Sequence, residues 1–394
     1  MTRIVVTGYG IKAPGVDTKD QFKEVLEKGI CTQQLVRGIG PHDSDLVLGV
    51  VDSELDRIGE KNYRKYPRVA KLAMAAADSA CTMSRLPSID PARIAVVMGT
   101  SIGGLLEIER YAVLSNNRQY RKFPLSGAGA GNPQSLSTAV AYHIGAKGLV
   151  LTLATGCTAG MDAMLMAKML LETNQADICI AGGSDAPLTT GCIYSFSKLG
   201  ALSREKDVAE AGNPFSKETE GFVMAEGAGV LVLEREHDAR GRGADIYGVI
   251  ENMASKNDGE SIFDSDRTGR TMTEVVQAAV GDKHPTYINS QALGLHVNDY
   301  SDYTAYMRTF GESIPITSIK GSIGHAFGAS GNLQTIAALL SMEYNFIAPT
   351  IKSTGKGFEE LPIAFEPHYT PVDRVAVTAH GYGGNNTCLL LAKY

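Results

Sequence analysis

The sequence predicts an α/β protein whose central sheet is covered by helices. Two short apolar runs, residues 94–98 and 178–180, are rich in β-branched residues and stop at or near glycine. Continuous apolar runs of this kind are typical of strands buried on both faces. Between them, residues 69–80 and 158–172 carry the apolar pattern of helices, the second of them apolar nearly all round. Strands that alternate with helices favour the α/β class.

The strand and helix pattern occurs twice along the chain, which predicts two related halves. Strands are expected at residues 4–6, 94–98, 149–153, 178–180 and 230–233, and again at 246–250, 286–289 and 388–391. The helix at 158–172 corresponds to a glycine-rich turn and helix at 321–340. The division falls near residues 238–245, so we expect halves at 1–240 and 241–394. Residues 112–135 and 255–270 are polar and irregular and are predicted to form loops or caps.

Composition and charge exclude several classes of protein. Of 394 residues, 44% are hydrophobic and 20% charged, so the chain can bury a large core. A net charge of −6 argues against a dedicated nucleic-acid binder. No apolar run reaches the length of about 18 residues that suggests a membrane span, and the N-terminus lacks the pattern of a secretory signal. We therefore expect a cytoplasmic protein with neither nucleic acid nor membrane as a partner.

The cysteines, histidines and glycine-rich segments do not indicate a bound metal or cofactor. The six cysteines are irregularly spaced without a CxxC pair, and the eight histidines are scattered. Neither a disulfide framework nor a zinc site is expected from such spacing. Residues 99–104 are rich in glycine but match neither the phosphate-loop nor the dinucleotide pattern. No metal, ATP or NAD is expected.

Cys157 stands in the context of a nucleophile. A predicted strand at 149–153 is followed by small residues, then by Cys157, and then by the apolar helix. This order places a thiol at a helix N-terminus, where the dipole and free N–H groups are expected to lower its pKa. Small neighbours would admit an acyl group and let backbone N–H groups face a developing oxyanion. The alternative is a buried structural cysteine.

Six motifs in order resemble the β-ketoacyl-acyl-carrier-protein synthases, the condensing enzymes of fatty acid and polyketide synthesis, over nearly the whole chain. They are residues 6–8, 99–104, the turn at Cys157, 213–229, 318–325 and 381–386. The resemblance implies a thiolase-like α/β fold with two pseudo-duplicated βαβαβαββ halves stacked in αβαβα layers. It also implies that an acyl chain passes from the phosphopantetheine of an acyl carrier protein to a cysteine, with no other cofactor.

The resemblance assigns roles to residues at matching positions. Cys157 matches the nucleophile, His325 the second of two catalytic histidines, and Lys320 the nearby lysine. Tyr382 matches the aromatic gate of a glycine-rich loop, although core packing is an alternative for it. The backbone N–H groups of Cys157 and Tyr382 would form the oxyanion hole.

The same loop brings Gly381 and Gly383 into the expected substrate-binding set. The other half of the site departs from the family pattern. Gln291 stands where the family has its first histidine, and Leu293 and Leu295 replace two threonines that contact the phosphopantetheine arm. A glutamine amide cannot act as an acid or a base near neutral pH, but it can still donate a hydrogen bond.

The family's glutamate that partners the lysine reads as Gln334. These departures leave three functions open. The chain either elongates the acyl group with malonyl-carrier protein by decarboxylative condensation, or transfers it without elongation. Alternatively, it is a chain-length-factor-like partner of a competent ketosynthase, although such partners characteristically lose the cysteine. A thiolase proper needs a second C-terminal cysteine, and Cys388 lies in an apolar run and reads as core.

Two kinds of partner follow from the resemblance. One is the acyl carrier protein, an acidic protein that would dock on basic residues such as Lys61, Arg64, Lys65 or Arg68, unless these form an ordinary solvated surface. The other is a second ketosynthase-fold subunit, because a homodimer or a heterodimer is expected.

Overall fold

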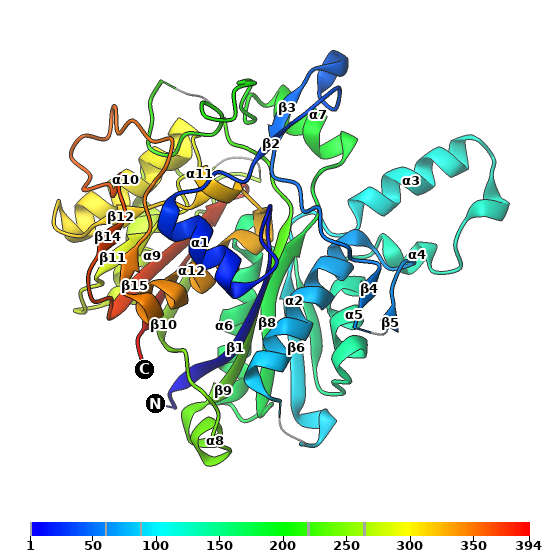
Figure 1. Ribbon diagram of the computed structural model, residues 1–394, viewed down its shortest axis with the longest axis horizontal. Coiled ribbons are helices and arrows are strands. Elements are labelled where there is room, and N and C mark those ends of the chain that lie inside the picture. Colours follow the sequence, from blue (N-terminus) through cyan, green and yellow to red (C-terminus); the bar gives the residue numbers. More distant parts are fainter. Residues whose placement is uncertain (1, 60, 87–88, 219–220, 263–264) are drawn as a thin grey trace.

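A ten-stranded mixed sheet runs through the centre of the molecule (Figure 1). This computed structural model describes residues 2–59, 61–86, 89–218, 221–262 and 265–394. In spatial order the strands are β12 (Ile316–Thr317), β11 (Tyr287–Asn289), β15 (Arg374–Gly381), β16 (Asn385–Ala392), β10 (Gly248–Asn257), β1 (Ile4–Lys12), β9 (Gly227–Arg235), β8 (Ile178–Asp185), β6 (Ile94–Gly99) and β7 (Val150–Leu153). β1 pairs antiparallel with β10, so strands from both halves of the chain share one sheet.

Helices cover both faces of the sheet and fill the space between its two halves. α2 (Arg68–Ser84) and α5 (Gln134–Ile144) cover the outer face of the first half. α9 (Arg270–Val280) and α10 (His296–Phe310) cover the outer face of the second. α6 (Ala159–Glu172) and α12 (Ser330–Tyr344) lie between the halves. The αβαβα layering implied by the resemblance is therefore confirmed.

Smaller elements surround these layers. The helices are α1 (Lys19–Lys28), α3 (Leu105–Asn116), α4 (Gly127–Ala130), α7 (Thr190–Lys198), α8 (Glu236–Gly241) and α11 (Lys320–Ile323). The 3-10 turns are η1 (Pro41–Asp43), η2 (Pro91–Arg93), η3 (Tyr120–Lys122), η4 (Gly156–Thr158) and η5 (Phe327–Ala329). The two-stranded sheets are β2 (Gln34–Val36) with β3 (Leu46–Leu48), β4 (Arg57–Ile58) with β5 (Lys61–Asn62), and β13 (Phe346–Ile347) with β14 (His368–Tyr369).

Close helix packing in the middle layer holds the later site together. α12 is buried from Ser330 to Met342, so it has almost no solvent-facing side. A Cβ placed on Gly160 of α6 would lie 1.8 Å from Oδ1 of Asn332, whose amide donates to the Gly160 carbonyl at 3.2 Å. Only glycine permits this approach of two helices. The starts of α6 and α12 therefore lie beside each other.

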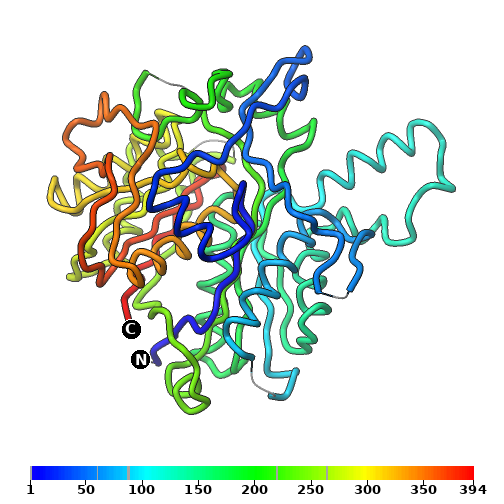
Figure 2. The backbone as a smooth tube through the Cα atoms, viewed as in Figure 1, coloured from blue at the N-terminus to red at the C-terminus, as the bar shows by residue number. Residues whose placement is uncertain are grey.

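The glycine-rich turn and helix expected at 321–340 are present as α11, a non-helical segment and α12, and this segment, residues 324–329, carries His325 into the site. The structure adds helices to another prediction. Residues 112–135, predicted to form loops or caps, contain the end of α3, η3 and α4. These elements project from the body of the molecule (Figure 2). Positions 263 and 264 of the other predicted loop lie outside the described residues.

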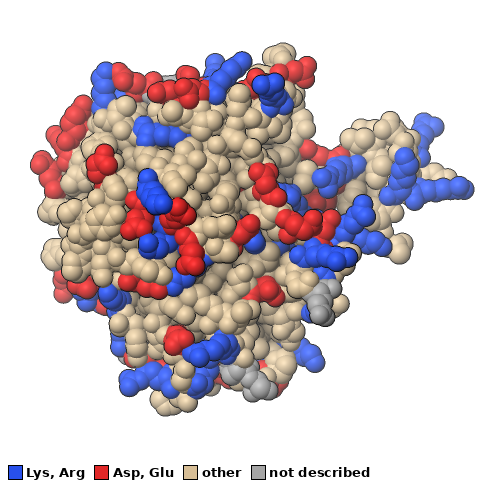
Figure 3. Space-filling model, in the orientation of Figure 1, with Lys and Arg blue, Asp and Glu red and all other residues tan. Residues whose placement is uncertain are grey.

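The projecting arm, residues 105–130, combines basic and apolar side chains. Figure 3 shows Lys and Arg side chains gathered on it, and the chain places Arg110, Arg118, Arg121 and Lys122 there. Leu125, between η3 and α4, is fully exposed. The pattern of helix α3 was hidden in the sequence because its apolar side chains are not packed into a core, which removes the usual periodic signal.

The ends of the chain meet at one edge of the molecule (Figure 2). The Arg3 guanidinium lies 5.9 Å from the Tyr394 ring centroid, and Tyr394 donates to Glu236 at 3.2 Å. Among the described residues, no helix is both long and apolar enough to cross a membrane.

Candidate active site

Cys157 lies where β7 passes through η4 into α6. Gly156 has a φ of 70°, which a residue with a Cβ adopts only with strain, and this turn presents the Cys157 side chain to a cavity of about 520 Å³. The predicted strand, turn and helix around the cysteine are confirmed.

His325 is the side chain in contact with the thiol. Its Nε2 lies 3.2 Å from Sγ of Cys157, and its Nδ1 lies 3.0 Å from Oγ of Ser330. The imidazole stacks on Phe327 with ring centroids 5.0 Å apart. Burial, helped by the positive charge of Lys320, holds the pKa of His325 well below its usual range. In the tautomer that carries its proton on Nδ1, the neutral imidazole can accept the thiol proton at Nε2 and donate from Nδ1 to Ser330.

The expectation of a lowered thiol pKa at Cys157 is wrong. Burial, with the nearby charge of Asp185, raises its pKa to about 12, and the backbone of Tyr382 and the charge of Lys320 offset this only in part. In this position, burial destabilises the charged thiolate by more free energy than the N-terminus of the helix stabilises it. The free site therefore holds a thiol beside a neutral base, the arrangement in which the base activates the nucleophile.

The loop after β15 closes over the sulfur. A Cβ on Gly381 would lie 2.9 Å from Cβ and 3.0 Å from the backbone N of Cys157, so the two backbones meet directly. Tyr382 follows, 43% exposed, and lines the cavity. Gly383 has a φ of 84° and forms the turn, but it does not line the cavity. The backbone of Tyr382 also interacts with the Cys157 thiol.

The cavity wall is mostly apolar. Leu293 and Leu295 line it, together with the aromatic rings of Phe196 and Phe222. An apolar wall around one polar centre is typical of a small-molecule site that holds an aliphatic group. Within the described part of the chain, no group of three His, Cys, Asp or Glu side chains is placed to hold a metal ion.

Lys320 lies behind the cavity and does not line it. Its Nζ donates to Oε1 of Gln334 at 2.8 Å, and the Gln334 amide donates to the carbonyls of Asn289, Ser290 and Thr378 at 3.0 to 3.1 Å. Burial lowers the pKa of Lys320 to about 7, although Asp302 and Cys157 act in the opposite direction. The lysine and the residue at the family's glutamate position are therefore in contact.

Gln291 does not reach the cavity. It is fully buried, and its Nε2 donates to the backbone carbonyl of His380 at 3.2 Å. Its side chain is absent from the cavity wall, and no hydrogen-bond partner of its Oε1 is found among the described residues. The amide that was expected to face a substrate is directed at the main chain.

Two functional candidates were missed in the sequence. His380 lines the cavity directly before Gly381, and Asp185 binds the loop beside Cys157. Asp185 accepts from the Thr100 hydroxyl at 2.6 Å and from the backbone N–H groups of Ser101, Ile102 and Gly328 at 2.7 to 2.9 Å. The position of His380 beside the glycine-rich loop was a signal that could have been used.

The C-terminal cysteine and the basic residues considered for carrier binding lie away from this site. Cys388 is buried in β16 within the second-half core, and it is absent from the cavity wall. Arg68 is held by Glu226, with Nε 2.6 Å from Oε2. Lys61 donates to the carbonyl of His143 at 3.2 Å and lines a different hollow.

Comparison with known proteins agrees with this architecture and site. The profile of the β-ketoacyl synthase N-terminal domain matches residues 1–239, and that of the C-terminal domain matches residues 247–354. The tetracenomycin polyketide synthase ketoacyl synthase alpha subunit of Streptomyces glaucescens is 31% identical, and the match covers 99% of this chain and 97% of that protein. The 3-oxoacyl-acyl-carrier-protein synthase 2 of Staphylococcus aureus (strain N315) is 30% identical over 100% and 98% of the two chains.

The fold also agrees with that of a solved ketosynthase structure. The ketosynthase of a type II polyketide synthase, in complex with its acyl-carrier protein and bound to the hexaketide, superposes with a TM-score of 0.88 at 28% identity. Both chains are covered completely. Two family profiles in succession, full-length relatives and a thiolase-like fold with a cysteine and histidine in contact leave one assignment: the chain belongs to the β-ketoacyl synthase family.

Proposed function

We propose that this protein is a ketosynthase that takes an acyl chain from an acyl carrier protein onto Cys157 and condenses it with malonyl-carrier protein. The observation that carries this proposal is the 3.2 Å contact between Sγ of Cys157 and Nε2 of a neutral His325 at a cavity wall. The relatives are ketosynthases of polyketide and fatty acid synthesis. The substrate class is therefore an acyl thioester on phosphopantetheine.

In the first half-reaction His325 takes the thiol proton as the sulfur attacks the thioester carbonyl. The backbone N–H groups of Cys157 and Tyr382 hold the negative oxygen that develops. The bond between the acyl carbon and the carrier sulfur then breaks, His325 returns its proton to that sulfur, and the carrier leaves as a thiol while the acyl group stays on Cys157. Leu293, Leu295, Tyr382 and the glycines of the 381–383 loop shape the passage for the arm and the acyl chain. Residues 1–240 thus supply the nucleophile, and residues 241–394 supply the lysine, the histidine and the loop.

The carrier protein is proposed to dock beside α7. Leu199 and Ala201 line the catalytic cavity, and Lys198, Arg204 and Lys206 border the neighbouring hollow. An acidic carrier would meet positive charge there, next to the cavity mouth. The basic residues at 61–68 serve this role less well, because Arg68 already pairs with Glu226. Lys206→Glu should raise KM for the carrier and weaken its salt dependence, with kcat unchanged.

A dimer is proposed through the sheet edge. β7, the strand that leads to Cys157, is the last strand of the ten-stranded sheet. An open edge of this kind is suited to pairing with a strand from a second ketosynthase-fold subunit. Light scattering of the purified chain should give twice the monomer mass if the partner is a second copy. A monomer that dimerises only with another ketosynthase subunit would assign the heterodimer.

A second candidate is a chain-length-factor-like partner subunit. Gln291 favours it, because the residue at the first histidine position neither carries a proton nor faces the cavity. The contact between Cys157 and His325 counts against it.

Intact mass spectrometry with acyl-carrier and malonyl-carrier protein separates the candidates. Elongated β-ketoacyl-carrier that disappears in Cys157→Ala supports condensation. Acylated enzyme without elongated product supports transfer alone. Absence of acylation, with elongation only after a second ketosynthase is added, supports the partner subunit and overturns the proposed function.

A further inference from the structure

The proposed reaction of malonyl-carrier protein, the extender, needs a hydrogen-bond donor that Gln291 does not supply. Gln291 stands at the position of the family's first histidine, yet its amide donates to the His380 carbonyl, and its side chain does not line the cavity. Lys320 lies behind the wall. Decarboxylation of a malonyl thioester needs a hydrogen-bond donor for the oxygen on which negative charge develops.

A second imidazole lies at this cavity, on another element. His380 is the penultimate residue of β15, and it lines the same cavity as Cys157 and His325. It is only 2% exposed. The next residue, Gly381, packs against Cys157 so closely that an added Cβ would lie 3.3 Å from Sγ. His380 therefore directly precedes a residue that packs against Cys157.

A buried carboxylate holds this imidazole. Nε2 of His380 lies 3.2 Å from Oδ1 of Asp302 on α10, a residue that is fully buried. The other oxygen of Asp302 accepts from the Ser290 hydroxyl at 2.6 Å, which fixes the carboxylate. A buried carboxylate at this distance stabilises the cationic form of an imidazole.

The surrounding charges separate the protonation states of the two histidines. Burial alone would lower the pKa of His380, but the charge and contact of Asp302 outweigh it, so the pKa is raised. His325 is shifted in the opposite direction. Other titratable groups facing this pair are Asp258, Asp299, Lys320 and Cys157. Two imidazoles kept in different states at one site are suited to different tasks.

We propose that His380, held by Asp302, is a catalytic residue of the extender half-reaction and supplies the imidazole that is missing at position 291. The inference rests on the proposed function and adds a residue to it. The bond between the malonyl α carbon and its carboxylate breaks, CO2 leaves, and the electron pair moves onto the thioester oxygen. His380 donates a hydrogen bond to that oxygen and keeps its proton.

Condensation then forms the new carbon–carbon bond. The α carbon of the enolate bonds to the carbonyl carbon of the Cys157 thioester. The carbon–sulfur bond breaks, the sulfur leaves with the bonding pair, and it takes up one proton from solvent to restore the Cys157 thiol. His380 acts before this step, and Cys157 and His325 act on loading. The two half-reactions therefore depend on different histidines.

His380→Gln separates the half-reactions. We expect CO2 release from radiolabelled malonyl-carrier protein to fall about 10²–10⁴-fold, while acylation of Cys157, followed by intact mass, stays within about threefold of the unmodified protein. His143→Gln is the matched control, because His143 also pairs with an aspartate, Asp78, at 2.9 Å but lines another hollow. It should leave both rates unchanged. Adding Gln291→His to His380→Gln should restore part of the CO2 release.

Several outcomes overturn the inference. Unchanged CO2 release in His380→Gln does so, and so does an equal loss of acylation and CO2 release in a folded variant. Failure of the unmodified protein to acylate Cys157 overturns the proposed function itself. Acylation without any CO2 release overturns the role of His380 together with the condensation step, and leaves acyl transfer onto Cys157 as the function.

Asp302→Asn provides an independent arm if His380→Gln fails to fold. Removing the carboxylate lowers the pKa of His380, so the alkaline limb of the pH profile of CO2 release should move to lower pH. The pH profile of Cys157 acylation should stay in place. An unmoved alkaline limb for CO2 release contradicts the inference.

Discussion

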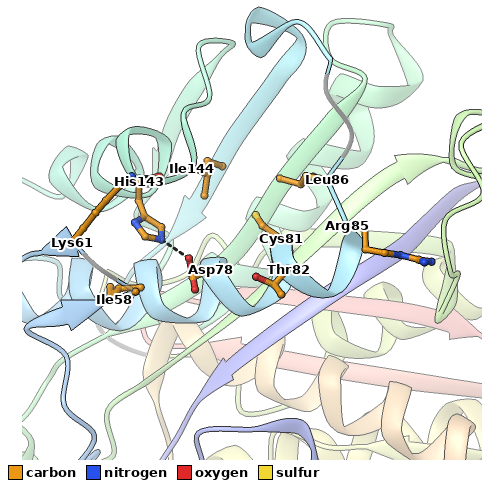
Figure 4. A pocket seen from close by; sticks show the side chains of 10 residues that line it. Ile58, Lys61, Asp78, Cys81, Thr82, Arg85, Leu86, His143 and Ile144 are labelled. Carbon is orange, nitrogen blue, oxygen red and sulfur yellow. Dashed lines mark hydrogen bonds and ion pairs between the residues drawn. The ribbon is translucent and has the colours of Figure 1, made fainter.

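The hollow at the C-terminal end of α2 and the cavity at Cys157 are lined by the same kinds of side chain. The first holds Cys81, His143, Asp78 and Lys61 (Figure 4). The second holds a cysteine and two histidines, with Lys320 and Asp302 behind them. The two are of comparable size, at about 730 Å³ and 520 Å³. Composition and size therefore do not distinguish a site from a surface depression.

The difference lies in which atoms are already engaged. Both nitrogens of His143 are occupied, one by the Tyr63 hydroxyl at 2.7 Å and one by Asp78 at 2.9 Å. This chain of contacts ties α5 to α2. Among the described residues, no hydrogen bond joins Cys81 to His143. In the catalytic cavity the imidazole instead contacts the thiol, and the thiol stands at the start of a helix. Reactivity follows from contacts, and the residue types alone do not create it.

The strongest test of this comparison exchanges each cysteine for alanine. Cys157→Ala removes the nucleophile, so thioester formation should fall to background in intact mass spectra. Cys81→Ala should leave the acylation rate within about twofold, because Cys81 has no base in contact. Labelling of Cys81 by an acyl-carrier substrate would contradict the distinction between the two regions.

The two histidines provide the next test. His325→Gln removes the base and should slow acylation by about 10²–10⁴-fold. His143→Gln removes two hydrogen bonds, a half-buried one to Tyr63 and an exposed one to Asp78, and should cost about 1–3 kcal/mol of unfolding free energy in urea titrations, with the acylation rate unchanged. A loss of acylation in a folded His143→Gln protein would show that the outer hollow takes part in the reaction.

Lys320 gives a test in pH. Burial lowers its pKa to about 7 in the folded protein, while the unfolded chain holds the proton to about 10.5. Between these values the unfolded state binds more protons, so this group makes the protein more stable as pH rises from about 7 to 10. Lys320→Met should remove this rise. The measurement is the urea unfolding free energy of both proteins from pH 6 to 9.5, compared as a difference. A difference that is independent of pH would contradict the lowered pKa.

The smallest effect concerns the apolar wall. Leu293→Thr and Leu295→Thr each place a hydroxyl beside the passage for the phosphopantetheine arm. Each new hydrogen bond should contribute about 1 kcal/mol, which corresponds to about a fivefold lower KM for malonyl-carrier protein. Steady-state kinetics at fixed acyl-carrier concentration measures this. An unchanged KM in both variants would show that the arm does not pass these residues.

Much of the fold and half of the site could be predicted from the sequence. Apolar runs that stop at glycine marked the buried strands, and the position of Cys157 at a strand-to-helix turn marked the nucleophile. The extender half resisted prediction. The Gln291 amide donates to the carbonyl of His380, 89 positions along the chain, and this contact could not be predicted from the sequence.

What the sequence by itself determined is the layered α/β architecture and the position of Cys157 at a strand-to-helix turn, because periodicity and local turn chemistry act over a few neighbouring residues. Only the tertiary structure decided which groups face one another and how charged they are. His380 meets Asp302 from a different element, and Cys157 keeps its proton because folding buries it. Solvation and contacts between distant segments set the protonation states of these side chains, and neighbouring residues in the sequence do not reveal either of them.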